Sequence, residues 1–184
     1  PVADAQLAEL DFRLPSMGRV SFASANLKRA VFQRCELRSA DFRKANLEGA
    51  DLREAILDGA RLQGARISGA TFRHASLKQA DLSDVDASGA DLSGTNLILA
   101  IARGARLSAA DLRFADAVGI VVDGADLRWA DLRNADLSKS SMRRARLWGA
   151  RVGKNRLPSD MAHWPFILRL AELFRGARRR GDTM

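Results

Sequence analysis

The side chains most often used in catalysis are scarce in this chain. It contains two histidines, His74 and His163, and one cysteine, Cys35. Nothing in their spacing brings the histidines together, so each is interpreted as a surface residue rather than a base or a metal ligand. Zinc-ligand spacings, a P-loop, a dinucleotide-binding glycine pattern and a Gly-x-Ser-x-Gly motif are absent from the sequence. The sequence therefore predicts a protein that is not an enzyme and has no catalytic, cofactor or metal site.

Aspartate and arginine are abundant, and their distribution is uneven. The whole chain of 184 residues carries a formal net charge of +8, which predicts attraction to nucleic acid, anionic membranes or acidic partners. Between Lys78 and Arg103, however, there is no basic residue. The middle of the chain is therefore locally acidic, and the basic excess lies toward the two ends. The acidic residues of this stretch are Asp81, Asp84, Asp86 and Asp91.

A repeat of five residues runs through the chain from Ala5 to Leu157. Its unit is shown by Ala45-Asn46-Leu47-Glu48-Gly49, whose residues are called here the first to fifth positions. All 31 third positions are apolar, 22 of the 31 first positions are Ala, and ten of the 14 glycines occupy the fifth position. No insertion breaks this phase. Internal repeats of this regularity indicate a solenoid.

A period of five fits neither an α-helix nor an ordinary β-strand, because their side chains repeat every 3.6 and 2.0 residues. It fits a short extended stretch followed by a corner. The third and first positions then point inward, and the fifth position makes the turn. Four such sides close a square coil of 20 residues, and Ala at the first position is required because a square tube has little room near each corner. Residues 20 apart are expected to stack.

These units resemble the pentapeptide repeat family, whose motif reads Ala-(Asp/Asn)-Leu-X-X. The resemblance covers residues 5–157, and it implies an all-β fold, a right-handed quadrilateral β-helix. We expect residues 1–157 to form this β-solenoid, with seven to eight coils, and residues 158–184 to form a short C-terminal α-helix and a basic tail. The resemblance to stand-alone bacterial members, together with the single cysteine and the lack of a visible signal sequence, predicts a cytoplasmic bacterial protein.

One stretch departs from the pattern. Third positions shrink to alanine at Ala87, Ala102 and Ala117, while nearby outward positions become apolar. A contiguous exposed apolar patch of this kind indicates an interface. The alternative is a local bulge that turns the larger side chains inward, because a slip of one residue exchanges the two faces of an extended chain. The patch residues are Ile98, Leu99, Ile101, Val118 and Val121.

Two neighbouring outward columns carry opposite charges. The first contains Arg13, Arg53, Arg73, Arg113 and Arg133, and the second contains Asp11, Asp51, Asp91, Asp111 and Asp131. One interpretation is a mutually neutralising surface. The other is an arginine ladder that binds a polyanion, although the aromatic interleaving typical of single-strand binding was not found in the sequence.

The C-terminal segment has the period of a helix after the entry signal at Ser159 or Asp160. Its apolar positions form two stripes, which is more than a cap on a narrow coil requires. Capping with homodimer formation is therefore expected, and the resemblance implies the same; a helix on a membrane surface is the alternative. The predicted dimer helix contains Trp164, Ile167, Leu168, Leu170, Leu173 and Phe174.

Three functional hypotheses follow. The first is a non-catalytic protein-interaction module, a rigid rod that presents the apolar patch and the C-terminal helix to an unidentified protein partner. The second is implied by the resemblance: some family members mimic duplex DNA, bind DNA gyrase or topoisomerase IV and protect it from quinolones. The acidic central coils fit this hypothesis and the net charge opposes it. The third is a binder of nucleic acid or anionic membrane through the basic ends.

Overall fold

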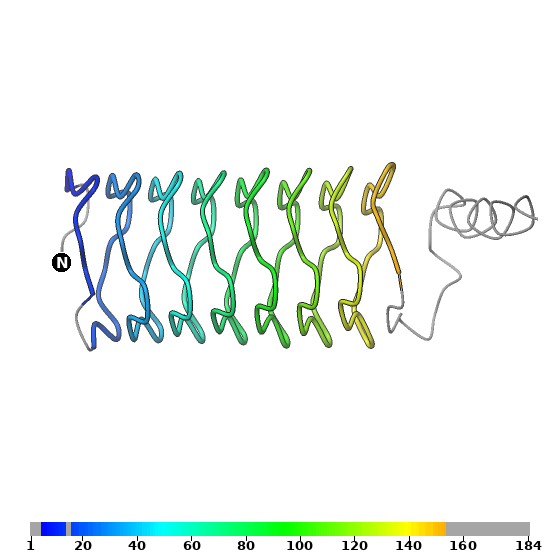
Figure 1. The fold of residues 1–184 in the computed structure, drawn as a ribbon, viewed down its shortest axis with the longest axis horizontal. Helices are drawn as coiled ribbons and strands as arrows, with labels where there is room; N and C mark the ends of the chain where they lie inside the picture. Colours follow the sequence, from blue (N-terminus) through cyan, green and yellow to red (C-terminus); the bar gives the residue numbers. More distant parts are fainter. Residues whose placement is uncertain (1–4, 14–15, 154–184) are drawn as a thin grey trace, which may run out of the picture.

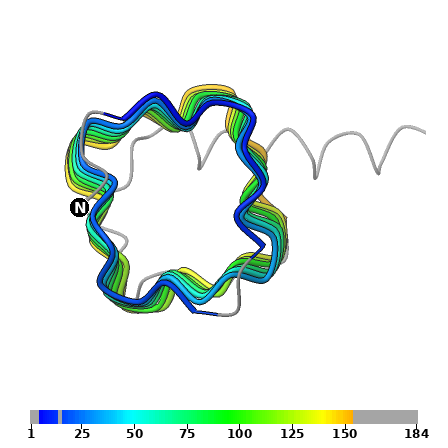
Figure 2. The same ribbon diagram turned by 90° about the vertical axis from the view of Figure 1, so that its left-hand side faces the viewer.

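The chain folds into a straight rod of stacked square coils. The structure, a computed structural model, describes residues 5–13 and 16–153. Figure 1 shows the coils side by side along the rod, and Figure 2 shows the square cross-section down its axis. The described residues between 5 and 144 belong to seven coils with a repeat of 20 residues, and residues 145–153 begin an eighth. The square β-solenoid predicted from the period of five is therefore confirmed.

The β-structure consists of single-residue parallel bridges rather than longer strands. A bridge residue recurs every five residues from Ser21 to Arg151, always at the second position of a unit. Each bridge joins residues that are 20 apart, as between Asn26 and Asn46. The described part of the chain contains no helix. The predicted C-terminal helix and tail, residues 158–184, lie outside the described residues.

The four sides of the tube are numbered here by their third-position columns. Side 1 contains Leu7, Leu27, Leu47, Ile67, Ala87, Leu107, Leu127 and Leu147; side 2 contains Phe12, Phe32, Leu52, Phe72, Leu92, Leu112, Leu132 and Val152; side 3 contains Met17, Leu37, Leu57, Leu77, Leu97, Ala117 and Leu137; side 4 contains Phe22, Phe42, Leu62, Leu82, Ala102, Val122 and Met142. From Phe22 onward every one of these side chains is buried. The core is therefore a continuous column inside the tube.

One unit, Ala45 to Gly49, shows how the backbone donors are satisfied. The N–H of Asn46 donates to a carbonyl of the preceding coil at 2.9 Å, and those of Leu47 and Gly49 donate to the next coil at 2.7 and 3.1 Å. The N–H of Ala50 closes the turn on the Leu47 carbonyl at 3.0 Å. The N–H of Glu48 has no carbonyl partner, and the side chain of Asn46 accepts it at 3.1 Å. Asp or Asn is preferred at the second position because it accepts this fifth N–H.

Every fifth position that the structure describes, from Glu9 to Gly149, has a positive φ between 55° and 74°. Together with the closing hydrogen bond, this is the pattern of a type II turn, which favours glycine at its third residue. Eighteen of these residues are nevertheless not glycine. A left-handed backbone costs a residue with a Cβ roughly 1 kcal/mol. In the described turns from Glu9 to Trp129, the inter-coil hydrogen bond of the fifth-position N–H offsets this cost.

Side chains at the fifth position lean along the rod toward the next coil. Four large ones lie over a glycine 20 residues later: His74 over Gly94, Asp84 over Gly104, Leu99 over Gly119 and Trp129 over Gly149. A Cβ added at any of these glycines would stand closer than 3.0 Å to the side chain beneath it. The absence of a side chain at these four glycines therefore makes room for the preceding coil.

The interior packs differently along the rod. In the first coils Phe12 stacks on Phe32 with ring centroids 4.7 Å apart, and Phe22 stacks on Phe42 at 5.2 Å. Farther along, Val85 and Ile120 occupy first positions that are elsewhere usually Ala, and the nearby third positions Ala87 and Ala117 are small. The large side chain is thus at the first position and the small one at the third, the reverse of the usual order. The total volume of the inward side chains therefore changes little.

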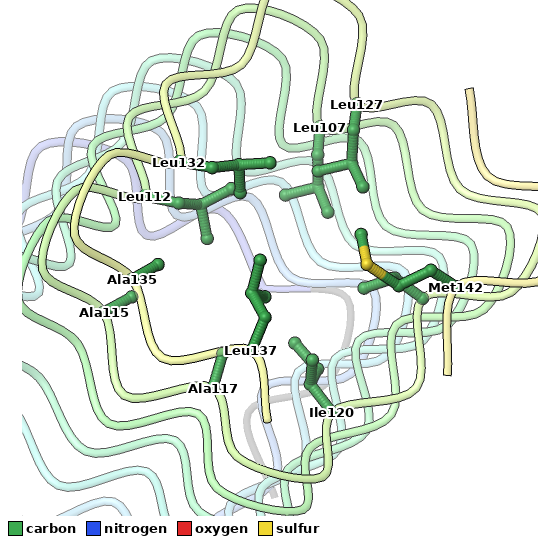
Figure 3. Close-up of a pocket in the computed structure, with 11 residues that line it drawn as sticks. Leu107, Leu112, Ala115, Ala117, Ile120, Leu127, Leu132, Ala135, Leu137 and Met142 are labelled. Atoms are coloured by element: carbon green, nitrogen blue, oxygen red, sulfur yellow. The ribbon is translucent and has the colours of Figure 1, made fainter. Parts of the chain in front are cut away.

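This exchange leaves two apolar cavities in the second half of the rod, each of about 20 Å³. One is lined by Ala117, Ile120, Leu137 and Met142 among others (Figure 3), and the other by Ala87 and Ala102. No polar side chain lines either cavity, so a trapped water molecule would find no hydrogen-bond partner. The core is therefore less tightly packed here than in the phenylalanine-rich coils.

We expect Ala102→Val to stabilise the protein by about 1 kcal/mol, because two added carbon atoms would enter the cavity that Ala102 lines. The matched control is Ala65→Val, at a fully buried first position that lines neither cavity. Overpacking there should destabilise by about 1–3 kcal/mol. Denaturant unfolding of both variants measures the difference. Destabilisation by Ala102→Val equal to that by Ala65→Val would show that the cavity cannot accept the larger side chain.

Candidate functional surfaces

The predicted apolar patch lies on the outside of the rod, at the corner between sides 3 and 4. The turn and bridge register continues without a bulge through residues 96–121. Leu99 is 53% exposed, and the other four side chains are half-buried at outward positions. The bulge alternative is therefore wrong. The five residues, called here the apolar corner, are Ile98, Leu99, Ile101, Val118 and Val121.

The apolar corner spans two stacked coils. Ile101 and Val121 form a parallel bridge, and the N–H of Leu99 donates to the carbonyl of Val118 at 2.9 Å. The same two columns return to polar residues in the coils on either side, with Lys78 and Asp81 before the corner. The apolar corner is therefore a short apolar surface, with polar residues above and below it in both columns.

The four central aspartates do not form one acidic surface. Asp81 and Asp84 lie on side 4, Asp86 on side 1 and Asp91 on side 2 of consecutive units. Three of the carboxylates are engaged in turn contacts: the Asp91 side chain, for example, accepts from the N–H and hydroxyl of Ser93 at 3.0 and 2.6 Å. The stretch that is acidic in the sequence is thus spread around the tube.

The local contacts also decide the charge state of these aspartates. Burial alone would raise the pKa of Asp81, but hydrogen bonds from Ser83 and Gln63 together bring that pKa below its usual value. Burial opposes ionisation of Asp86 in the same way, and its bonds from Ser88 again lower the pKa. Both groups are therefore stabilised as carboxylates that accept hydrogen bonds, not as proton donors.

The arginine and aspartate columns on side 2 are paired within the same units. Arg53, Arg113 and Arg133 each hold the aspartate two residues earlier, with closest N–O distances of 2.6 Å. Arg13 pairs with Asp11 in the same way, and Arg73 lies 3.8 Å from Asp91 of the next coil. This column therefore has little free positive charge to offer a polyanion.

Asp41 has the most enclosed of these carboxylates. Its side chain is 7% exposed and meets Arg43 at 2.7 Å and Arg61 at 2.9 Å. The hydrogen bond from the Arg43 side chain lowers the pKa of Asp41, against the opposing effect of burial, and the charge of Arg61 adds to the lowering. Asp41 therefore favours the folded state in its ionised form.

Three exposed aromatic residues were missed by the sequence analysis. Phe114 is 65% exposed, Trp129 55% and Trp148 54%, each at a fourth or fifth position. The indoles of Trp129 and Trp148 meet edge to face, with ring centroids 4.4 Å apart. The repeat phase itself marks all three positions as outward. The low aromatic content of the chain gives no sign of these residues, whereas their positions within the five-residue unit do.

The residues first considered for chemistry lie apart from one another. His74 is an exposed turn residue with its ring over Gly94, and Cys35 is fully buried, its thiol donating to the Phe12 carbonyl at 2.8 Å. His163 lies outside the described residues. Within residues 5–13 and 16–153, no group of three or more His, Cys, Asp or Glu residues could hold a metal ion. In the same ranges, no helix is long and apolar enough to cross a membrane.

Comparison with known protein families identifies the same five-residue repeat. The family model described as pentapeptide repeats matches eight copies, over residues 16–53, 45–84, 55–94, 80–116, 90–128 and 123–152. None of the curated proteins matches the chain.

Several solved structures are similar. HetL, a pentapeptide repeat protein involved in heterocyst differentiation regulation from the cyanobacterium Nostoc sp. strain PCC 7120, is 30% identical, with a TM-score of 0.43 and coverage of 84% of this chain and 82% of HetL. Full-length QnrB1, a plasmid-mediated fluoroquinolone resistance protein, is 18% identical, with a TM-score of 0.41 and coverage of 90% and 87%. A pentapeptide repeat protein from the Arabidopsis thaliana thylakoid lumen is 30% identical, with a TM-score of 0.34 and coverage of 53% and 71%.

The paired aspartates predict acid lability. Because the pKa of Asp41 is lowered in the folded state, its contribution to stability is present above its unfolded pKa of about 3.9 and is lost as the pH falls through the folded value. The free energy of unfolding should therefore decrease below about pH 4. Asp41→Asn should lose about 1.5 kcal/mol at pH 7 and show a shallower loss below pH 4. Thermal unfolding followed by circular dichroism at pH 7, 5, 3 and 2.5 tests this; an identical pH profile for both proteins would contradict it.

Proposed function

Because the chain belongs to the pentapeptide repeat family, we propose that it is a non-catalytic protein-interaction module that binds a protein partner through its apolar corner. The C-terminal segment, residues 158–184, is the second contact surface in this proposal and is expected to support homodimer formation. The observation that supports the proposal is the apolar corner itself, because the fold requires no apolar residue at the second, fourth or fifth position of a unit.

The physical argument is one of exposed area. Leu99 projects from a turn over Gly119, and its two neighbours Ile98 and Val118 widen the apolar strip on the same column. Polar residues at these positions would cost the fold nothing, since Lys78 occupies the same column one coil earlier. A contiguous apolar surface bounded by polar residues is typical of a protein-binding site. The rigid coils hold it in one geometry, so little conformational entropy would be lost on binding.

The topoisomerase hypothesis receives less support. A mimic of duplex DNA requires a continuous acidic surface, whereas the central aspartates are divided among three sides. Three of them, Asp81, Asp86 and Asp91, also accept hydrogen bonds within their own turns. Elsewhere the carboxylates are paired with arginines, as on side 2. The surface that the repeat builds is therefore charge-balanced where a DNA mimic would be negative.

Replacing Ile98 and Val118 by lysine tests the apolar corner. Lys78 shows that the column accepts lysine, so the double variant should fold with an unchanged β circular dichroism spectrum. Proteins that cross-link to the wild-type chain at this corner are identified by mass spectrometry. The double variant should no longer cross-link to them. Ser108→Lys, in a column that already contains Arg128, is the matched control and should keep them. Retention of the same cross-linked partners by the double variant would remove the corner from the interface.

A supercoiling assay separates the topoisomerase hypothesis from this proposal. DNA gyrase is titrated with the protein, with and without a quinolone, at two salt concentrations. We expect no protection from the quinolone, because the carboxylates are dispersed and paired. Protection at protein concentrations too low to coat the DNA would contradict this expectation and would make Asp81 to Asp91 the residues to substitute.

A further inference from the structure

A second exposed surface lies at the C-terminal end of the rod, on side 1 and away from the apolar corner. Trp148 is the fourth-position residue of the unit 145–149, the last unit that the structure describes in full, and Trp129 contacts it from the preceding coil. Gly149 leaves the space in which the Trp129 indole lies, since a Cβ there would overlap the ring. The two indoles stand edge to face, which is a favourable aromatic geometry. More than half of each side chain nevertheless remains exposed.

Three arginines precede Trp148 along the chain, at the end of the seventh coil and the start of the eighth. Arg143, Arg144 and Arg146 are all exposed, and within residues 16–153 none of them forms an ion pair with a carboxylate. They differ in this from the arginines of side 2. Arg144 and Trp148 are turn residues at the two ends of one side, and the four residue steps between their Cα atoms would span at most about 13 Å if fully extended at about 3.3 Å per residue. The three guanidinium groups and the indole pair therefore belong to one surface.

The carboxylates nearest to this surface are already engaged. Asp126, bridged to Arg146 in the stack, is held by Arg128 at 2.6 Å. Asp123 accepts from the N–H of Arg143 at 2.8 Å and from the hydroxyl of Ser141 at 2.6 Å. Four arginines thus face two aspartates, and the surface keeps a positive excess. An anionic ligand with exposed planar groups could pair with the arginines and also stack on the indoles.

We propose that Arg143, Arg144, Arg146, Trp129 and Trp148 form a binding site for single-stranded nucleic acid. The arginines contact the phosphates, and a base stacks on the exposed face of Trp148, which the edge-on contact with Trp129 holds in place. Stacking on an aromatic side chain accepts every base, so the site binds with little sequence preference. This site is separate from the protein-interaction corner proposed above.

The arrangement favours a single strand over a duplex. The faces of paired bases are stacked inside a duplex and cannot reach an indole, so only phosphate contacts would remain. Those contacts alone would use the arginines and leave the tryptophan pair without a role. An anionic lipid surface or a sulfated polysaccharide likewise offers charge but no base to stack.

The test is fluorescence anisotropy with the full chain and a labelled 20-nucleotide poly(dT) strand, at two salt concentrations. Poly(dT) duplexed with poly(dA), heparin as competitor and phosphatidylserine vesicles are the comparison probes. Trp148→Ala should weaken binding of the single strand about 10-fold or more, the loss expected for one stacked base. Arg144→Ala combined with Arg146→Ala should reduce the salt dependence, by about 0.7 in the slope of log K against log salt for each phosphate that the variant no longer neutralises.

Two matched controls separate this site from general charge and from general exposure. Arg53→Ala removes an arginine that Asp51 already neutralises, and Leu99→Ala shortens a similarly exposed side chain that also lies over a glycine. Both should bind the strand as the wild type does, and circular dichroism should show all variants folded. Binding that survives Trp148→Ala, as it would if the basic residues after 174 carried it, would overturn the proposal. Equal or tighter binding of the duplex, heparin or the vesicles, or no binding of the strand at low salt, would overturn it as well.

Discussion

The fold depends on one constraint, that a turn every five residues must still satisfy every backbone N–H. Three donors of each unit reach the neighbouring coils, a fourth closes the turn, and the fifth is taken by an Asp or Asn side chain where one is present, as at Asn46. Because buried donors without partners are costly, the phase cannot slip without breaking this arrangement in several coils at once. The spacing of the apolar residues, the positive φ at each turn and the stacking of residues 20 apart all follow from it.

The same constraint explains why the fold could be predicted from the sequence and much of the surface could not. The inward positions are constrained by sterics, so the period of five was sufficient to predict the square coil and the buried third positions. Outward positions carry no such restriction. The apolar corner was predicted because five apolar residues depart from the polar pattern together. The Trp129–Trp148 contact joins residues in different coils, and it became visible only after each side chain was placed by its phase and its stacking partner.

The net charge of the chain does not show where free charge lies on the rod. The chain has a net charge of +8, but on side 2 the arginines are held by aspartates of the same unit or the next coil. A run of acidic residues in the sequence is divided among three sides by the coil. In the part of the chain that the structure describes, Arg143, Arg144 and Arg146 lack such a partner and lie near the exposed indole of Trp148. In a solenoid of this kind, position around the tube decides what a charged residue can contact.

Each large side chain that lies over a glycine contacts a residue 20 positions later in the sequence. Such a contact also limits which substitutions the two positions can accept during evolution. As they are oriented, the side chains of Trp129, Leu99 and His74 leave no room for a Cβ at the turn of the next coil. Substitutions at each of these pairs are therefore coupled: while the large side chain keeps this orientation, the glycine 20 residues later cannot be replaced alone. Such a pair is expected to change together, or to change only after the large residue has been shortened or reoriented.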